Sequence, residues 1–108
     1  MRIVSIEEAK RSFVVVRERG PAWDAALTLR EQRGWAEHAH FMDALVDEGF
    51  VVQGGPVGEG QRVLLIVAAT DEDQIRARLA ADPWSPHLLE LVSVEPWTIL
   101  LGADGPRG

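Results

Sequence analysis

Residues 35–70, WAEHAHFMDALVDEGFVVQGGPVGEGQRVLLIVAAT, contain the pattern that decides the fold. Residues 35–48 carry apolar side chains at helical spacing, and Gly49 is typical of the position where a helix ends. The run 50–56 predicts a strand, and the glycine-rich GGPVGEGQ that overlaps its end predicts a turn. The nearly all-apolar run 62–70 predicts a second strand, which such a composition places centrally in its sheet.

The segments on either side supply one further strand and one further helix. SFVVVRER at 12–19 is a β-branched run ended by Gly-Pro, which predicts a strand. Residues 71–81 predict a helix capped by Thr70 or Asp71, because acidic residues occupy its first turn and arginines follow.

The final strand is predicted over residues 88–101, after Pro83 and Pro86 break the preceding helix. Pro96 lacks an N–H, so this strand must lie at a sheet edge or contain a bulge there. The order β-α-β-β-α-β with right-handed crossovers predicts an α+β, ferredoxin-like fold, in which two helices cover one face of a four-stranded antiparallel sheet.

The remaining segments are less patterned. Residues 20–34 predict either a surface loop or one helical turn around Asp24–Leu29, and Ser5 with Glu8 fits a capping box. The 108 residues predict a single domain, 1–108, with a core of about 12–101 and a flexible C-terminal tail.

Composition excludes several classes of protein. The net charge of −6 argues against a nucleic-acid-binding surface, which needs clustered basic residues. The chain has no cysteine, so thiol catalysis, disulfides and cysteine-ligated metals are excluded. The N-terminal apolar run is too short for a signal peptide, and no window approaches the roughly 18 apolar residues of a membrane span. We therefore expect a cytoplasmic protein without membrane or nucleic-acid partners.

One face of the predicted sheet has no helix in the chain to cover it. Its apolar side chains need another surface, and a second copy of the chain supplies one. We therefore expect a homodimer formed through the open sheet face, a dimeric α+β barrel.

The two histidines of the first predicted helix separate on a helical wheel. His38 falls within an apolar stripe, whereas His40 falls among acidic residues and is expected at the surface. His38 also lies in the first turn, where the helix dipole favours the neutral ring that can act as a general base. The alternative is a core histidine hydrogen-bonded to a carbonyl. The remaining members of the stripe are Trp35, Ala39, Met42, Leu45 and Val46.

The stretch HAHFMDALVDEGFVVQGGP, followed by DPW and VEPWTILL, resembles the YciI-related (YCII) family, whose members are small dimeric α+β barrels. The shared pattern is a histidine early in the first helix, a glycine after that helix, a Gly-Pro and an Asp-Pro-aromatic. It covers roughly residues 12–101, and the residues that carry it are His38, Gly49, Gly55-Pro56 and Asp82-Pro83-Trp84.

The resemblance implies a histidine–aspartate dyad in a pocket between helix and sheet, formed by His38 and Asp82. Family members include a dehydrochlorinase, so it also implies small-molecule lyase or isomerase chemistry. We expect this chemistry to need no cofactor and to act on a small substrate that can carry a carboxylate. The alternatives are a non-catalytic ligand-binding or regulatory dimer, a purely structural partner, and, ranked last, a haem-degrading enzyme. The segment 20–34 is longer than in shorter members and would cover the pocket.

Each remaining candidate has a structural alternative. Asp82 precedes a proline, as turn aspartates do. Trp35 and Trp84 are predicted pocket walls, with core packing as the alternative. Arg17 is predicted to bind a substrate carboxylate unless it ends its strand in solvent, and Gly55 to let backbone approach a ligand.

Three of the four remaining features are assigned to structure. Trp97 is predicted to pack in the core or dimer interface. Arg19, like Arg17, could bind a substrate carboxylate or end its strand in solvent. His87 is favoured as a turn residue, although His38, Asp82 and His87 together could ligate a metal. No spacing demands such a site, so no metal is predicted. The glycines of GGPVGEG open no helix, so they predict a hairpin and not a phosphate loop.

Overall fold

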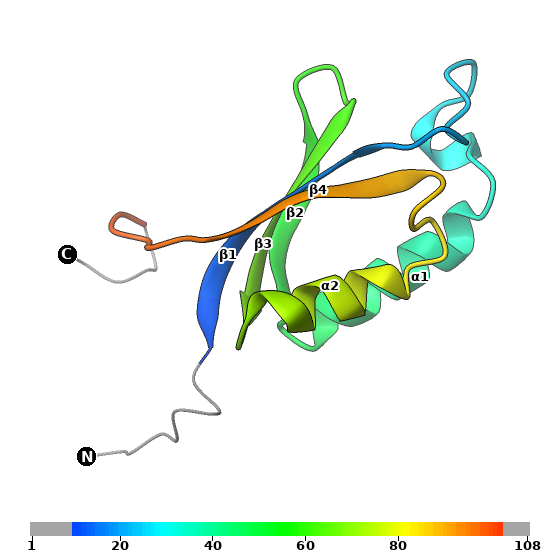
Figure 1. Cartoon of the computed structure of the whole chain (residues 1–108). Helices are drawn as coiled ribbons and strands as arrows, with labels where there is room; N and C mark the ends of the chain where they lie inside the picture. The colour runs from blue at the N-terminus through cyan, green and yellow to red at the C-terminus, as the bar shows by residue number, and fades with distance from the viewer. Residues whose placement is uncertain (1–9, 103–108) are drawn as a thin grey trace, which may run out of the picture.

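The computed structural model describes residues 10–102, and these form four strands and two helices in the predicted β-α-β-β-α-β order (Figure 1). A short 3-10 turn precedes the first helix. The elements are β1 (Arg11–Arg19), η2 (Leu29–Glu31), α1 (Trp35–Asp47), β2 (Val51–Val57), β3 (Arg62–Ala69), α2 (Glu72–Ala80) and β4 (Leu89–Pro96).

The strands form one antiparallel sheet in the order β2-β3-β1-β4. This is the strand order of the ferredoxin-like fold, so the predicted fold class is confirmed. β4 lies at an edge, where the missing N–H of Pro96 is tolerated. A register shift between Val16 and Arg17 also marks a bulge in the β1–β4 pairing.

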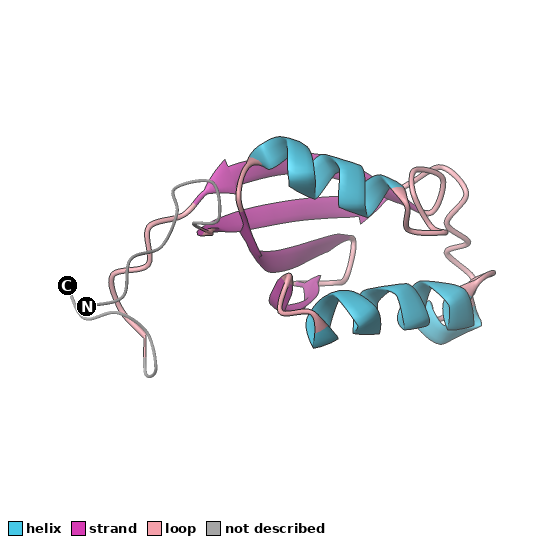
Figure 2. Cartoon of the chain, turned by 90° about the horizontal axis from the view of Figure 1, so that it is seen from below, coloured by secondary structure: helices cyan, strands magenta, loops and turns pink. Residues whose placement is uncertain are grey.

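Both helices lie on the same side of the sheet, and the core is between them and the sheet (Figures 1 and 2). Asp71 begins α2 as its N-cap, since its side chain accepts a hydrogen bond from the Gln74 N–H at 2.8 Å. The buried core consists of Phe13, Val15, Leu45, Phe50, Val51, Leu65, Val67, Ala69, Ile75, Leu79 and Val94.

The opposite face of the sheet is also partly apolar. Alternation along β1 and β3 places Val14, Val16, Leu64 and Ile66 on this face, because their neighbours along each strand point to the core. Both helices lie on the other side. This surface therefore matches the one through which a dimer was predicted.

Two segment boundaries differ from the prediction. The helical turn between 20 and 34 is at Leu29–Glu31, not Asp24–Leu29, because Thr28 and Glu31 form a capping box. The last strand ends at Pro96, five residues before the predicted end at 101. Trp97 lies beyond it and is 43% exposed, so its predicted place in the core of the chain is wrong.

The buried face of α1 also differs from the prediction. Val46 is 49% exposed, because the stripe of α1 that faces the sheet is centred on His38 and Leu45 instead of on Trp35. The predicted capping box at Ser5 and Glu8 lies outside the described residues, as does most of the predicted tail. Within residues 10–102, no helix is long and apolar enough to cross a membrane.

Candidate functional site

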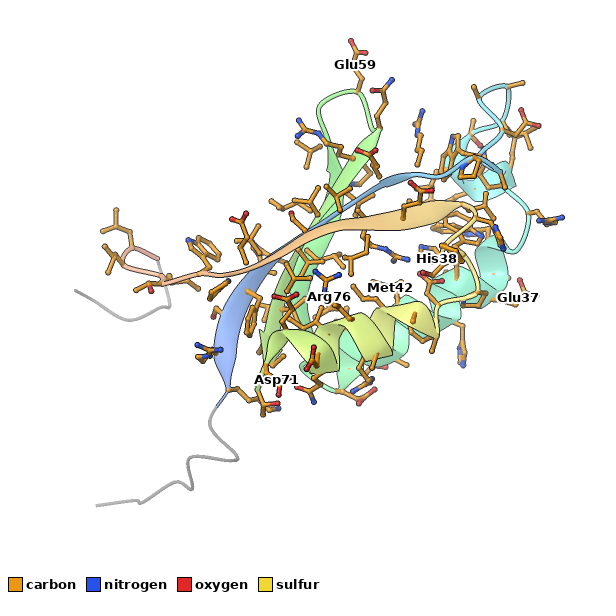
Figure 3. All side chains as sticks on the ribbon, viewed as in Figure 1. Glu37, His38, Met42, Glu59, Asp71 and Arg76 are labelled. Carbon is orange, nitrogen blue, oxygen red and sulfur yellow. The ribbon has the colours of Figure 1, made fainter. Side chains whose placement is uncertain are left out.

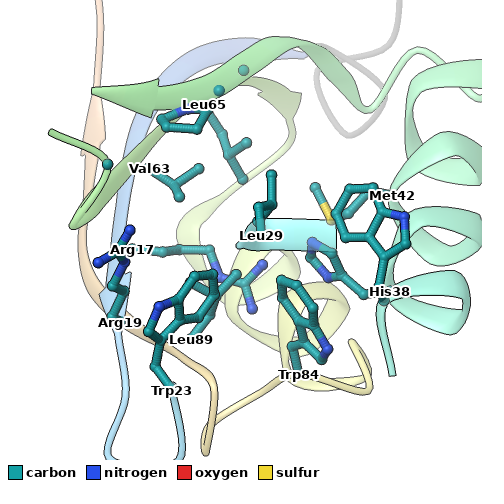
Figure 4. Close-up of a pocket in the computed structure, with 15 residues that line it drawn as sticks. Arg17, Arg19, Trp23, Leu29, His38, Met42, Val63, Leu65, Trp84 and Leu89 are labelled. Carbon is teal, nitrogen blue, oxygen red and sulfur yellow. The ribbon is translucent and has the colours of Figure 1, made fainter. Parts of the chain in front are cut away.

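A cavity of about 280 Å³ lies between the sheet, α1 and the segment 20–34 (Figure 4). Five of the six predicted site residues line it, and the sixth, Asp82, lies behind two of them. The lining is largely apolar and contains no carboxylate. It consists of Arg17, Arg19, Trp23, Leu29, Trp35, His38, Met42, Gly54, Gly55, Pro56, Gly60, Val63, Leu65, Trp84 and Leu89.

Arg17 reaches this cavity because of its place in β1. Phe13, Val15 and Arg17 alternate along the strand, so all three side chains project to the helix-covered face. Arg17 is only 1% exposed, which rules out the alternative of a solvated strand end. Figure 4 shows its side chain running from β1 toward His38.

His38 projects from the first turn of α1 into the space between helix and sheet, on the same side as Met42, whereas Glu37 points away (Figure 3). Its ring stacks on Trp84 with centroids 4.0 Å apart and planes 6° apart. Stacking fixes the plane of the imidazole, because any rotation of the ring would collide with the indole. His40 is exposed, as the helical wheel predicts.

Asp82 is held in the turn after α2, and it is 2% exposed. Its backbone N–H donates to the Leu79 carbonyl at 3.1 Å, and its Oδ1 accepts from the Trp84 N–H at 2.9 Å. The Asp-Pro-Trp sequence thus forms a turn that both orients the carboxylate and places the Trp84 ring under His38. Asp82 can therefore stabilise the turn and contact His38 at the same time.

Three donors converge on the Asp82 carboxylate. Arg17 Nη1 donates to Oδ2 at 2.8 Å, and His38 Nδ1 lies 2.9 Å from both oxygens. Burial alone would raise the pKa of Asp82, but hydrogen bonds from His38, the Trp84 N–H and Arg17, with the Arg17 charge, outweigh it and hold this pKa below its ordinary value. The carboxylate is therefore ionised at neutral pH.

An ionised carboxylate only accepts hydrogen bonds, so the proton of a neutral His38 ring is on Nδ1. Nε2 then carries the lone pair. Among residues 10–102 no side chain or backbone group is hydrogen-bonded to Nε2, and the ring borders the cavity. This is the arrangement of a histidine oriented by a carboxylate for proton transfer.

Two tryptophans flank the histidine, and a third packs against one of them. Trp84 is fully buried, and its Nε1 donates to the Arg33 carbonyl at 2.7 Å. Trp35 lies 5.8 Å from Trp84 and 5.9 Å from His38, measured between ring centroids. Trp23 packs edge-on against Trp84 at 5.6 Å. Trp35 and Trp84 thus form cavity walls, as predicted, and Trp84 also packs within the fold.

The sequence reasoning missed Trp23 as a wall of the cavity. Trp23 and Leu29 come from the segment 20–34, which has no periodicity that would place a side chain. The segment is held by Gln32, whose buried amide bonds the N–H and carbonyl of Asp24 and the carbonyl of Leu27. The buried Gln32 is the feature that marks this segment as ordered, but a single sequence does not show that a glutamine is buried.

The glycines of β2 differ in how tightly their surroundings fit them. A Cβ on Gly54 would collide with Leu65 Cδ2 and lie 2.9 Å from the Leu64 carbonyl oxygen. A Cβ on Gly55 would meet nothing within 4 Å. Gly55 lines the cavity, yet it is Gly54 at which packing demands a glycine. The β2–β3 connection is a hairpin, as predicted.

Of the remaining candidates, His87 lies outside the site and Arg19 lies at the cavity. His87 is exposed in the turn before β4, where its carbonyl accepts from the Ala22 N–H at 2.9 Å, so the predicted turn position is confirmed. Arg19 does line the cavity, and its guanidinium lies 4.7 Å from the centroid of the Trp23 ring. No group of three or more metal-binding side chains is found in the described part of the chain.

Comparison with known proteins adds no relative. No protein-family model matches the chain, and no curated protein or solved structure matches it. Membership of the YCII family therefore stays a prediction that rests on the motif positions and their spacing.

Proposed function

We propose that this protein is a YciI-like, cofactor-free enzyme that transfers a proton in a lyase or isomerase reaction on a small molecule. The observation that carries the proposal is the 2.9 Å contact between His38 Nδ1 and Asp82, on a ring that borders an apolar cavity. A catalytic base needs an orienting partner on one nitrogen and access to substrate on the other.

In the proposed reaction, His38 Nε2 removes a proton from a carbon of the substrate. The electron pair left on carbon either expels a leaving group, as in a lyase, or moves along the substrate, which His38 reprotonates at another carbon, as in an isomerase. Asp82 stays ionised and stabilises the imidazolium through the Nδ1 hydrogen bond. Trp35 and Trp84 hold the substrate against the ring.

Proton transfer is tested by solvent exchange. The protein is incubated in D2O with small cyclic and unsaturated acids and their halogenated analogues, and deuterium uptake or halide release is followed by NMR or ion chromatography. His38→Gln should abolish turnover, whereas His40→Gln, on the exposed side of the same helix, should leave it unchanged. Turnover retained in His38→Gln would contradict the mechanism.

A non-catalytic binding protein is the alternative, and the apolar aromatic lining favours it as much as it favours an enzyme. If compounds bind without exchange or release, and His38→Asn binds them as tightly as wild type, recognition alone is the function.

We also propose a homodimer through the open sheet face. The support for this is the row of partly exposed apolar side chains on that face, represented by Val14, Val16 and Leu64. A second copy packing its own open face there would bury both rows.

A further inference from the structure

Arg17 has more hydrogen-bond donors than the protein uses. Nη1 donates to Asp82, but Nε and Nη2 are buried and have no partner among residues 10–102. Buried donors without partners are rare, and each costs on the order of 1–3 kcal/mol. An apolar residue at this position of β1 would fill the same space without that cost, so the free donors point to a ligand.

The geometry of the free donors selects a type of ligand. Nε and Nη2 form one edge of the planar guanidinium, and their N–H bonds are parallel, which matches the two oxygens of a carboxylate. Nε of Arg19, at the same cavity, also has no partner within the described chain. Asp82 pairs with Arg17, whereas the Arg19 guanidinium lies over the Trp23 ring and has no carboxylate partner among residues 10–102, so one negative charge from a ligand would balance the site.

The walls of the cavity select the rest of the ligand. Trp23, Trp35 and Trp84 present apolar aromatic surface, which suits a planar body. The cavity of about 280 Å³ is larger than the roughly 150 Å³ apolar cavity that accepts benzene. There is room for one ring with its carboxylate.

We propose that this cavity binds a single-ring or similarly small planar monocarboxylate, and that Nε and Nη2 of Arg17 hold its carboxylate. Arg17 and His38 are hydrogen-bonded to the same Asp82 carboxylate, so an acid bound by Arg17 lies next to the imidazole. Nε and Nη2 of Arg17 are closed to water, so a ligand reaches them only when neighbouring side chains move, after which the ion pair forms out of water. The identification of this acid as a substrate rests on the proposed function.

The proposal is tested by calorimetric titration with benzoate and with benzamide, its neutral analogue of the same shape. Benzoate should bind about tenfold or more tightly than benzamide, the factor expected for hydrogen bonds to a charged group. Arg17→Lys keeps a positive charge but loses the parallel donors, so it should remove most of this preference. Arg62→Met, at an exposed arginine of β3, is the matched control and should keep it.

A second measurement uses the wild-type protein alone, so it holds even where Arg17→Lys fails to fold. The ¹⁵N-labelled Nε–H signal of Arg17 should move on addition of benzoate and stay in place with benzamide. Equal affinities for the two compounds, no saturable benzoate binding, or a shift confined to other arginines would overturn the proposal.

These results are separable from the test of catalysis. His38→Gln should keep the preference for benzoate over benzamide, since the histidine does not hold the carboxylate. Benzoate binding that depends on Arg17, together with turnover that does not depend on His38, would leave the ligand class standing and remove the mechanism. Turnover that depends on His38 but is confined to neutral compounds would leave the mechanism standing and remove the ligand class.

Discussion

Replacing Asp82 by asparagine should lower the free energy of unfolding by about 3–5 kcal/mol at neutral pH, the cost of breaking a buried ion pair by removing one partner. The substitution keeps the size of the side chain but leaves the Arg17 guanidinium buried without its counter-charge. It also weakens the hydrogen bonds from His38 and the Trp84 N–H. Domains of this size unfold with about 5–15 kcal/mol, so the loss is a large share of the total.

The effect should depend on pH in one direction. The pKa of Asp82 is lower in the folded protein than in the unfolded chain, so the folded state binds its proton less readily. Ionised Asp82 therefore stabilises the fold fully above the unfolded-state pKa of about 3.9, and this contribution is lost as the pH falls through the folded-state pKa. The stability difference between wild type and Asp82→Asn should be constant near neutrality and shrink below about pH 4.

The assay is urea unfolding followed by tryptophan fluorescence from pH 7 down to pH 3. Near neutrality the melting temperature of Asp82→Asn should also fall by about 12–20 °C, given roughly 4 °C per kcal/mol for a domain of this length. Glu72→Gln is the control, because Glu72 pairs with Arg76 at the surface and its loss should cost under about 1 kcal/mol. A cost for Asp82→Asn no greater than that of the control, or a difference unchanged at low pH, would refute the reasoning.

Two further predictions concern the sheet. Gly54→Ala should destabilise the protein by about 1–3 kcal/mol because its Cβ has no space, whereas Gly55→Ala should change stability by less than about 0.5 kcal/mol, both measured by thermal unfolding. Leu64→Arg, which adds a charge to the open face, should convert the proposed dimer into a monomer in light scattering; a wild-type protein that is already monomeric would disprove the dimer.

The secondary structure and topology follow from local patterns in the sequence. Residues 35–48 and 62–70 were predicted within one residue of α1 and β3, because helical spacing and an apolar strand run are both local signals. The prediction was less accurate where the chain continues past its last pairing partner. Residues 97–101 have strand-like composition, but only the Trp97 N–H continues the pairing, donating to the Ser12 carbonyl at 2.8 Å close to the start of β1 at Arg11.

The candidate site was only partly predictable for a related reason. The helical wheel indicates His38 as an inward-facing histidine, whereas its pairing with Asp82 is implied only by the resemblance to the YCII family. The burial of Arg17 was not predictable, since it results from cover by segments distant in the sequence. Phe13, Val14, Val15 and Val16 are all apolar, so the run conceals which face of β1 turns inward. The side chain of Arg17 lies on the inward face of β1, which the sequence alone does not identify.

The polar groups of the site occupy positions that packing alone would assign to apolar side chains. Arg17 continues the row of Phe13 and Val15, and His38 shares the inner stripe of α1 with Leu45. Replacing a buried ionic group by apolar residues of similar volume is often neutral or even stabilising, by roughly 1–4 kcal/mol. Stability therefore gives no reason for an arginine here, least of all one with two donors unused. An anionic ligand that takes up those donors beside the imidazole gives such a reason, and it links the binding of an acid to the proton transfer proposed for His38.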